Sequence, residues 1–149
     1  MKTQLKTDLF KEHTEHWENL ATVDKVSLIA GSVECFSFAI SAFQTCLQQH
    51  SGCRISSPNY SPTRLLYFNA NKEDPFVRLV EPTPGATHLY TALSHCWGGS
   101  QILSTAHKTL TESMTAIDWE ALPRTFQDGF TVGRQLGIHY LWIDSLCIL

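Results

Sequence analysis

The sequence of 149 residues is poor in charge and lacks any cluster of basic residues. Charged residues make up 17% of the chain, and 11 lysines and arginines stand against 14 acidic residues, so the formal net charge is −3. A protein that binds nucleic acid normally presents positive charge to the phosphate backbone, so we expect no nucleic-acid partner. Hydrophobic residues make up 43% of the chain, which predicts a folded domain with a core.

The chain also lacks a long, uninterrupted apolar run. The first 20 residues do not contain the continuous apolar stretch of a secretory signal. Residues 26–43 have about the length of a membrane span, but Glu34 and four serines interrupt them, so we expect no membrane segment. Cysteine occurs five times, an odd number, which together with the missing signal predicts reduced thiols and a cytoplasmic protein.

The clearest periodic pattern lies in the first third of the chain. Seven apolar residues are spaced alternately three and four apart, which places them on one stripe of a helix: Val26, Ile29, Val33, Phe36, Ile40, Phe43 and Leu47. We expect one long amphipathic helix, with Asp24 as its N-cap and Gly52 as its stop. Packing against its own domain is the simplest interpretation, and a coiled-coil or partner helix is the alternative. Residues 1–50 are therefore predicted as a helical lead-in, and residues 51–63, rich in Ser, Pro and Gly, as a loop.

Short strands are predicted beyond this loop, because turn-forming residues separate runs of β-branched, aromatic and other apolar residues. These runs are residues 64–69, 76–81 and 89–95. Residues 140–143 (YLWI) form a solid apolar run, which is typical of a parallel strand covered on both faces. The predicted fold class is therefore α/β, with a mixed sheet that contains a buried, parallel strand.

Two helices are expected between these strands. One lies within residues 105–114. The other begins at Pro123, with Thr125 and Asp128 as a capping pair and Gly137 as the stop. The positions of Phe126, Phe130, Gly133 and Leu136 would share one face of this second helix, which we expect to pack on the sheet.

Three segments occur in an order that resembles the heterokaryon incompatibility (HET) domain of filamentous fungi. They are residues 90–98 (YTALSHCWG), 122–128 (LPRTFQD) and 136–148 (LGIHYLWIDSLCI). The upstream pattern of Cys46, His50 and Cys53 is similar to what often precedes that domain. The resemblance implies a role in non-self recognition, in which fusion of incompatible fungal cells triggers programmed cell death through protein partners or self-association.

The resemblance covers only the first part of a HET domain, because the family pattern continues with a Gln and acidic residues after the third segment. Residues 64–149 are therefore predicted as a partial, truncated HET domain, and an inactive fragment is one interpretation. HET domains are also distantly similar to TIR domains, some of which cleave NAD. The resemblance thus implies either an interaction and effector module or, as the alternative, a TIR-like NAD-hydrolysing enzyme.

Asp144 is the candidate catalytic residue, because it follows the predicted strand at 140–143. Ligands of α/β sheets bind beyond the carboxyl ends of the strands. A carboxylate there can stabilise an oxocarbenium ion or orient a ribose hydroxyl, and the structural alternative is a carboxylate that caps the next element. Gly98 and Gly99 are the candidate cofactor-binding residues, since glycine lets a ligand approach the backbone closely, although the pair lacks the full dinucleotide spacing.

Two further groups of side chains carry weaker hypotheses. Neighbouring residues on a strand point to opposite faces, so His95 is not expected to activate Ser94 or Cys96 as a nucleophile. Three side chains have the spacing of zinc ligands, namely Cys46, His50 and Cys53, but a structural zinc site needs four ligands. His13 or His16 could supply the fourth zinc ligand, but no spacing pattern in the sequence connects them to the other three. We therefore expect buried free cysteines, no metal and no bound cofactor.

Overall fold

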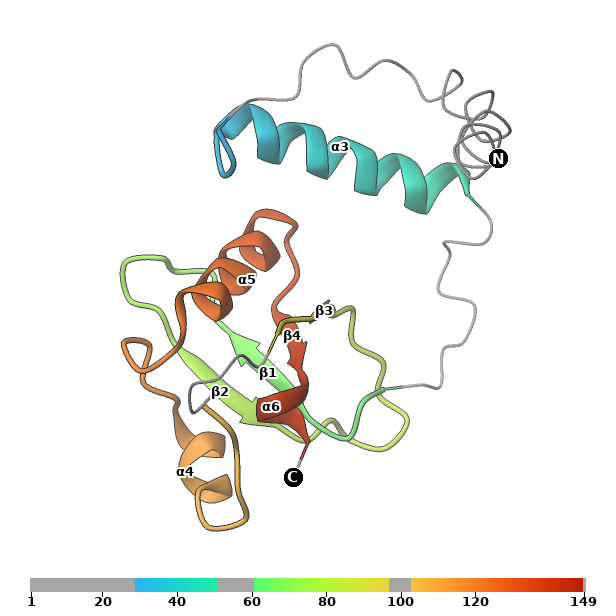
Figure 1. Cartoon of the computed structure of the whole chain (residues 1–149). Helices are drawn as coiled ribbons and strands as arrows, with labels where there is room; N and C mark the ends of the chain where they lie inside the picture. The colour runs from blue at the N-terminus through green and yellow to red at the C-terminus, as the bar shows by residue number, and fades with distance from the viewer. Residues whose placement is uncertain (1–28, 51–60, 97–102, 149) are drawn as a thin grey trace, which may run out of the picture. The chain divides into compact units, whose positions relative to one another are not determined.

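The computed structural model describes residues 29–50, 61–96 and 103–148, drawn in colour in Figure 1. The chain divides into two compact units, Met1–Ala39 and Ile40–Leu149. The boundary falls within the first described helix, so this helix and the sheet that follows it in the chain are described separately. No helix in the described ranges is both long enough and apolar enough to cross a membrane.

Helix α3 spans Val33–Gln49 and begins later than the sequence predicts. Residues 29–32 form a turn, in which Gly31 has a φ of +82°, a conformation that glycine adopts readily. The Ser32 hydroxyl then accepts a hydrogen bond from the Cys35 amide at 3.2 Å, as an N-cap does. The prediction of one continuous helix from Asp24 was therefore wrong, and Asp24 and Gly52 themselves lie outside the described residues.

Four strands form one mixed sheet in the order β2–β1–β4–β3. Their bounds are Leu65–Phe68 for β1, Val77–Val80 for β2, Thr91–Leu93 for β3 and Tyr140–Ile143 for β4. Strand β1 is antiparallel to both β2 and β4, whereas β3 is parallel to β4. The predicted α/β class with a mixed sheet is confirmed, and β4 is the interior strand with a parallel neighbour.

Strand β4 is fully covered on one face only. Leu141 and Ile143 are buried, whereas Tyr140 and Trp142 are half-buried. The prediction of a strand covered on both faces was therefore wrong. On the face of Tyr140, its ring lies 5.7 Å from the ring of Tyr67, so aromatic side chains of neighbouring strands cover one another there.

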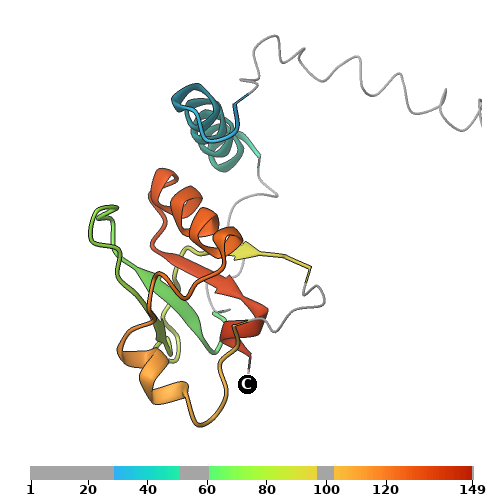
Figure 2. The same ribbon diagram turned by 60° about the vertical axis from the view of Figure 1, so that its left-hand side comes forward.

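Three helices follow the first three strands in the chain: α4 at Leu110–Thr115, α5 at Arg124–Gln135 and α6 at Asp144–Cys147. Helix α5 packs against β3 and β4, while α4 packs against β2, as the two views show (Figures 1 and 2). The side chain of Asn69 bridges the β1–β2 connection. It accepts a hydrogen bond from the backbone N–H of Phe76 at 3.0 Å and donates one to the backbone carbonyl of Asp74 at 2.8 Å.

Helix α5 ends where the sequence predicts but begins without the predicted capping box. Thr125 lies inside the helix, and Pro123 occupies the N-cap position without a side-chain hydrogen bond, so the predicted capping pair was wrong. The side-chain Nε2 of Gln127 instead donates to the backbone carbonyls of Trp119 and Leu122, at 3.0 and 3.2 Å. The predicted stop is confirmed, because Gly137 follows the helix with a φ of +70°.

The core lies between the sheet and these helices. Its buried members are Leu66, Phe68, Val77, Leu79, Leu122, Phe126, Phe130, Leu141, Ile143, Leu146 and Cys147. A Cβ atom on Gly133 would lie only 2.6 Å from Cζ of Phe68, so glycine is required for helix α5 to approach strand β1 this closely. The ring of Phe130 then meets that of Phe68 edge-on, with 5.1 Å between ring centroids.

Candidate functional site

The carboxyl ends of β3 and β4 lie side by side, because the two strands run parallel. Leu93 at the end of β3 pairs with Ile143 at the end of β4. The next residues of each chain segment therefore meet at one edge of the sheet. Across this edge, Nδ1 of His95 lies 3.6 Å from Oδ1 of Asp144, a contact that is longer than a hydrogen bond and is an ion pair only when the histidine is protonated.

Asp144 is the first residue of helix α6, directly after β4. Its side chain is 35% exposed, so the carboxylate is accessible to a ligand. Oδ1 also accepts a hydrogen bond from the Ser145 amide at 2.7 Å, which fixes that oxygen at the start of α6. The structural role and the ligand-binding role considered for this carboxylate therefore do not exclude each other.

His95 was missed as a partner of Asp144, since sequence reasoning compared it only with its chain neighbours. Its side chain is 9% exposed, whereas Ser94 and Cys96 are exposed, as the alternation along an extended chain requires. The imidazole ring meets Phe126 of helix α5 edge-on at 4.9 Å. Helix α5 thus holds the ring from one side, and the Asp144 carboxylate faces its Nδ1 atom.

Two buried hydroxyl groups belong to the same end of the sheet. Ser145 and Thr105 are 3% and 6% exposed, and the Thr105 amide donates to the Ser145 carbonyl at 3.0 Å. Neither hydroxyl oxygen has a hydrogen-bond partner among the described residues. A buried hydroxyl without a partner costs about 1–3 kcal/mol, so these groups are costly unless they serve a ligand or water. No sequence signal singled out Thr105, while Ser145 lies in the segment that resembles HET domains.

The structure describes only some of the other residues considered as ligands. Gly98, Gly99, Cys53, His13 and His16 lie outside the described residues, so their roles stay predictions. In α3, Cys46 is half-buried, and the exposed His50 follows the helix. Within residues 29–50, 61–96 and 103–148, no three histidine, cysteine or acidic side chains are grouped as a metal site would require.

Of the cysteines that the structure describes, Cys147 is buried in the core as expected, whereas Cys35 and Cys46 are half-buried and Cys96 is exposed, so the expectation of buried thiols was wrong for Cys96. Burial raises the pKa of the Cys147 thiol from its ordinary value of 9.0 to about 11. A thiol with such a raised pKa is protonated at neutral pH and is a poor nucleophile. The Cys147 carbonyl accepts a hydrogen bond from Nε of Arg64 at 3.0 Å, which ties helix α6 to the start of β1.

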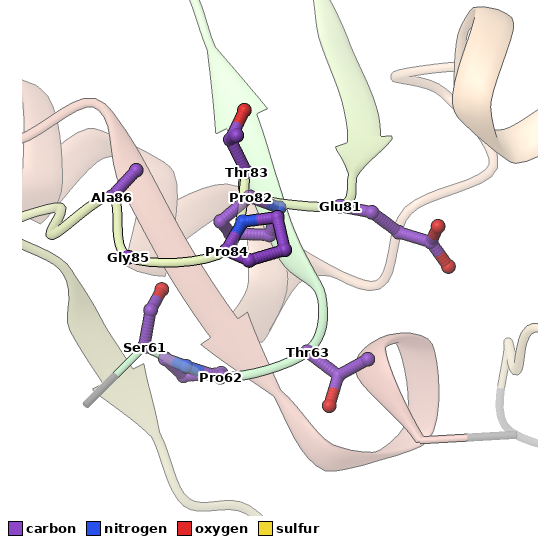
Figure 3. Close-up of a pocket in the computed structure, with 9 residues that line it drawn as sticks. All are labelled: Ser61, Pro62, Thr63, Glu81, Pro82, Thr83, Pro84, Gly85 and Ala86. Atoms are coloured by element: carbon purple, nitrogen blue, oxygen red, sulfur yellow. The ribbon is translucent and has the colours of Figure 1, made fainter. Parts of the chain in front are cut away.

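A pocket of about 540 Å³ lies away from the Asp144 carboxylate and was not predicted. Its two walls are residues 61–63 before β1 and residues 81–86 after β2, which face each other in Figure 3. Pro62, Pro82 and Pro84 line it, and its charged group, Glu81, is paired with Arg64 at 3.3 Å. The pocket thus offers proline rings and small hydroxyl side chains, and none of the groups that carry the candidate chemistry.

Residues 90–149 match the family model described as "Heterokaryon incompatibility protein (HET)". The matched region contains β3, α4, α5, β4 and α6, together with His95 and Asp144. The resemblance drawn from the three sequence segments is confirmed over this region. The similarity of the upstream pattern of Cys46, His50 and Cys53 rests on the sequence alone. No curated protein and no solved structure matches the chain.

Proposed function

We propose that this chain, a member of the HET family over residues 90–149, acts in fungal non-self recognition as an interaction and effector module of programmed cell death. The observation that carries the proposal is the family match, because a function related to heterokaryon incompatibility follows from it. In this role the chain works in the cytoplasm, through protein partners or through copies of itself.

Killing activity tests this proposal directly. The chain is expressed from an inducible promoter in a filamentous fungus, and viable colonies are counted before and after induction. We expect wild-type chain to lower viability, and the core variant Phe130→Ala, which lacks a fully buried ring, to lose the effect. Wild-type chain at normal abundance without any loss of viability would contradict the effector role.

A second candidate function is hydrolysis of NAD by a TIR-like mechanism. The observation that favours it is the accessible Asp144 carboxylate beside His95 at the carboxyl ends of two parallel strands. Cleavage of the bond between ribose and nicotinamide leaves the ribose with oxocarbenium character, which a carboxylate can stabilise until water adds. Nicotinamide takes the bonding electrons and leaves as a neutral molecule, while the water adds its hydroxyl group to the ribose carbon and releases its proton to the solvent.

The two functions are separated by comparing turnover with killing. Purified wild-type chain is incubated with NAD, next to Asp144→Asn and to Asp74→Asn as a matched control, since Asp74 is exposed in the β1–β2 connection. If the enzyme proposal holds, Asp144→Asn lowers turnover by about 100-fold or more and also abolishes killing, while Asp74→Asn changes neither. Killing by Asp144→Asn at the wild-type level, without NAD turnover by any variant, leaves the interaction module as the function.

A further inference from the structure

We infer that His95 is a positioning residue for the Asp144 carboxylate, with its Nδ1–H directed at Oδ1. The inference rests on the second proposed function, in which Asp144 acts on the substrate. It assigns to His95 no contact with substrate. The role concerns the orientation of the carboxylate.

The topology of the sheet brings the two side chains together. Leu93 and Ile143 are the last residues of β3 and β4 and pair in register, although 50 positions separate them in the chain. His95 comes two residues after Leu93, on the same face of the extended chain. Asp144 comes directly after Ile143, where α6 begins. The contact between Nδ1 and Oδ1 at 3.6 Å thus follows from the strand register.

His95 is more deeply buried than Asp144, so the two side chains have different roles. The His95 side chain is 9% exposed and the Asp144 side chain 35% exposed. The ring of Phe126 meets the imidazole edge-on at 4.9 Å, so helix α5 limits how far His95 can rotate. The buried member therefore holds the orientation, and the exposed member remains accessible to a ligand.

The carboxylate is held from two directions. The Ser145 amide donates to Oδ1 at 2.7 Å, and His95 approaches the same oxygen through Nδ1. In a neutral histidine, the group opposite each ring nitrogen decides which nitrogen carries the proton. A carboxylate oxygen opposite Nδ1 favours a proton on Nδ1, because the reverse arrangement would place two acceptors against each other.

The position of this proton is the first test, and it requires no activity. Imidazole nitrogen shifts of the full chain are recorded by NMR at a pH where His95 is neutral, with His95→Phe to assign its signals among the seven histidines. We expect Nδ1 to be protonated in the wild-type chain. In Asp144→Ala, the fraction with a protonated Nδ1 falls by at least half. A wild-type ring protonated on Nε2, or an unchanged ring in Asp144→Ala, would overturn the inference.

Kinetics give the second test and separate the inference from the function on which it rests. His95→Phe keeps a ring against Phe126 but removes the N–H group that faces Asp144, whereas His95→Gln keeps an N–H group. We expect NAD turnover to fall about 10- to 100-fold in His95→Phe and clearly less in His95→Gln, as for residues that orient a reacting group. Loss of turnover in Asp144→Asn but not in His95→Phe would overturn the positioning role and leave the enzyme proposal intact. No turnover by any variant, with the Nδ1 proton dependent on Asp144, would refute the enzyme proposal while supporting the pairing.

Discussion

Helices α3 and α5 are both built from apolar and polar residues, but only α5 contributes buried residues. Helix α5 buries Phe126, Phe130 and Gly133. Helix α3 is richer in apolar residues, yet none of its residues is buried, and Val33 and Phe38 are 78% and 50% exposed. Apolar content by itself therefore does not decide which helix contributes to a core.

Two features of α5 account for its burial. Its apolar residues are concentrated on one face, while the rest of the helix is polar, so only one orientation toward the sheet removes them from water. Gly133 then lets this face approach Phe68, where any larger residue would collide. In α3 the apolar side chains are spread more evenly around the helix, and Phe38 lies off the seven-residue stripe.

Removal of a ring from each helix should give the largest contrast. We expect Phe130→Ala to lower the free energy of unfolding by about 3–5 kcal/mol, because the ring is fully buried and leaves a cavity. The matched variant Phe38→Ala should change it by no more than about 0.5 kcal/mol. Urea unfolding, followed by the fluorescence of Trp119 at 5.8 Å from Phe130, measures both. Equal losses of stability in the two variants would contradict the conclusion that α5, and not α3, contributes buried side chains.

The buried Cys147 thiol should make the stability of the folded chain depend on pH in the alkaline range. Cys147 has a pKa of about 11 in the folded chain and ionises near 9.0 when unfolded, so the unfolded chain releases its proton first. Stability should therefore fall as pH rises from about 9 to about 11, by about 2–3 kcal/mol, and Cys147→Ala should lack this component. Urea unfolding at pH 8, 9, 10 and 11 measures it. Cys35→Ala in α3 is the control, and the same pH slope in Cys147→Ala would contradict the assignment.

The smallest effect concerns the start of α3. Ser32→Ala removes the oxygen that accepts the Cys35 amide, so we expect a loss of about 1 kcal/mol in the stability of this helix. Amide hydrogen exchange at Cys35 reports it, with an expected rise of about fivefold in exchange rate. Ser37→Ala, at an exposed position inside the same helix, should leave the Cys35 rate unchanged or lower it. A rise in both variants would show that Ser32 is no cap.

Much of the sheet region could be predicted from the sequence because its signals are local. The strands at 65–68, 77–80 and 140–143 follow from apolar runs bounded by turn residues, and the end of α5 follows from Gly137. The start of α3 could not be predicted in the same way. The apolar stripe continues through residues 29–32 without a change of period, and only the left-handed Gly31 interrupts it.

Of the two side chains that form the candidate site, the sequence predicted one. Asp144 could be found because it follows a strand directly, and the family resemblance included it. His95 was considered only as a base for its chain neighbours. Its contact with Asp144 could not be predicted, since the sequence does not reveal which strand lies next to β4. The half-exposure of Tyr140 and Trp142 was missed for a similar reason, because an apolar run does not reveal which face of a strand a helix covers.

Local patterns in the sequence were enough to predict the strands, the α/β class and the similarity of residues 90–149 to the HET family, since these depend on periods, turns and short segments within the chain. The tertiary structure alone decided that His95 meets Asp144, that Gly133 meets Phe68 and that α5 rather than α3 contributes buried residues. The physical reason is that strand order and register arise from the packing of segments tens of residues apart. No local pattern encodes which of these segments become neighbours.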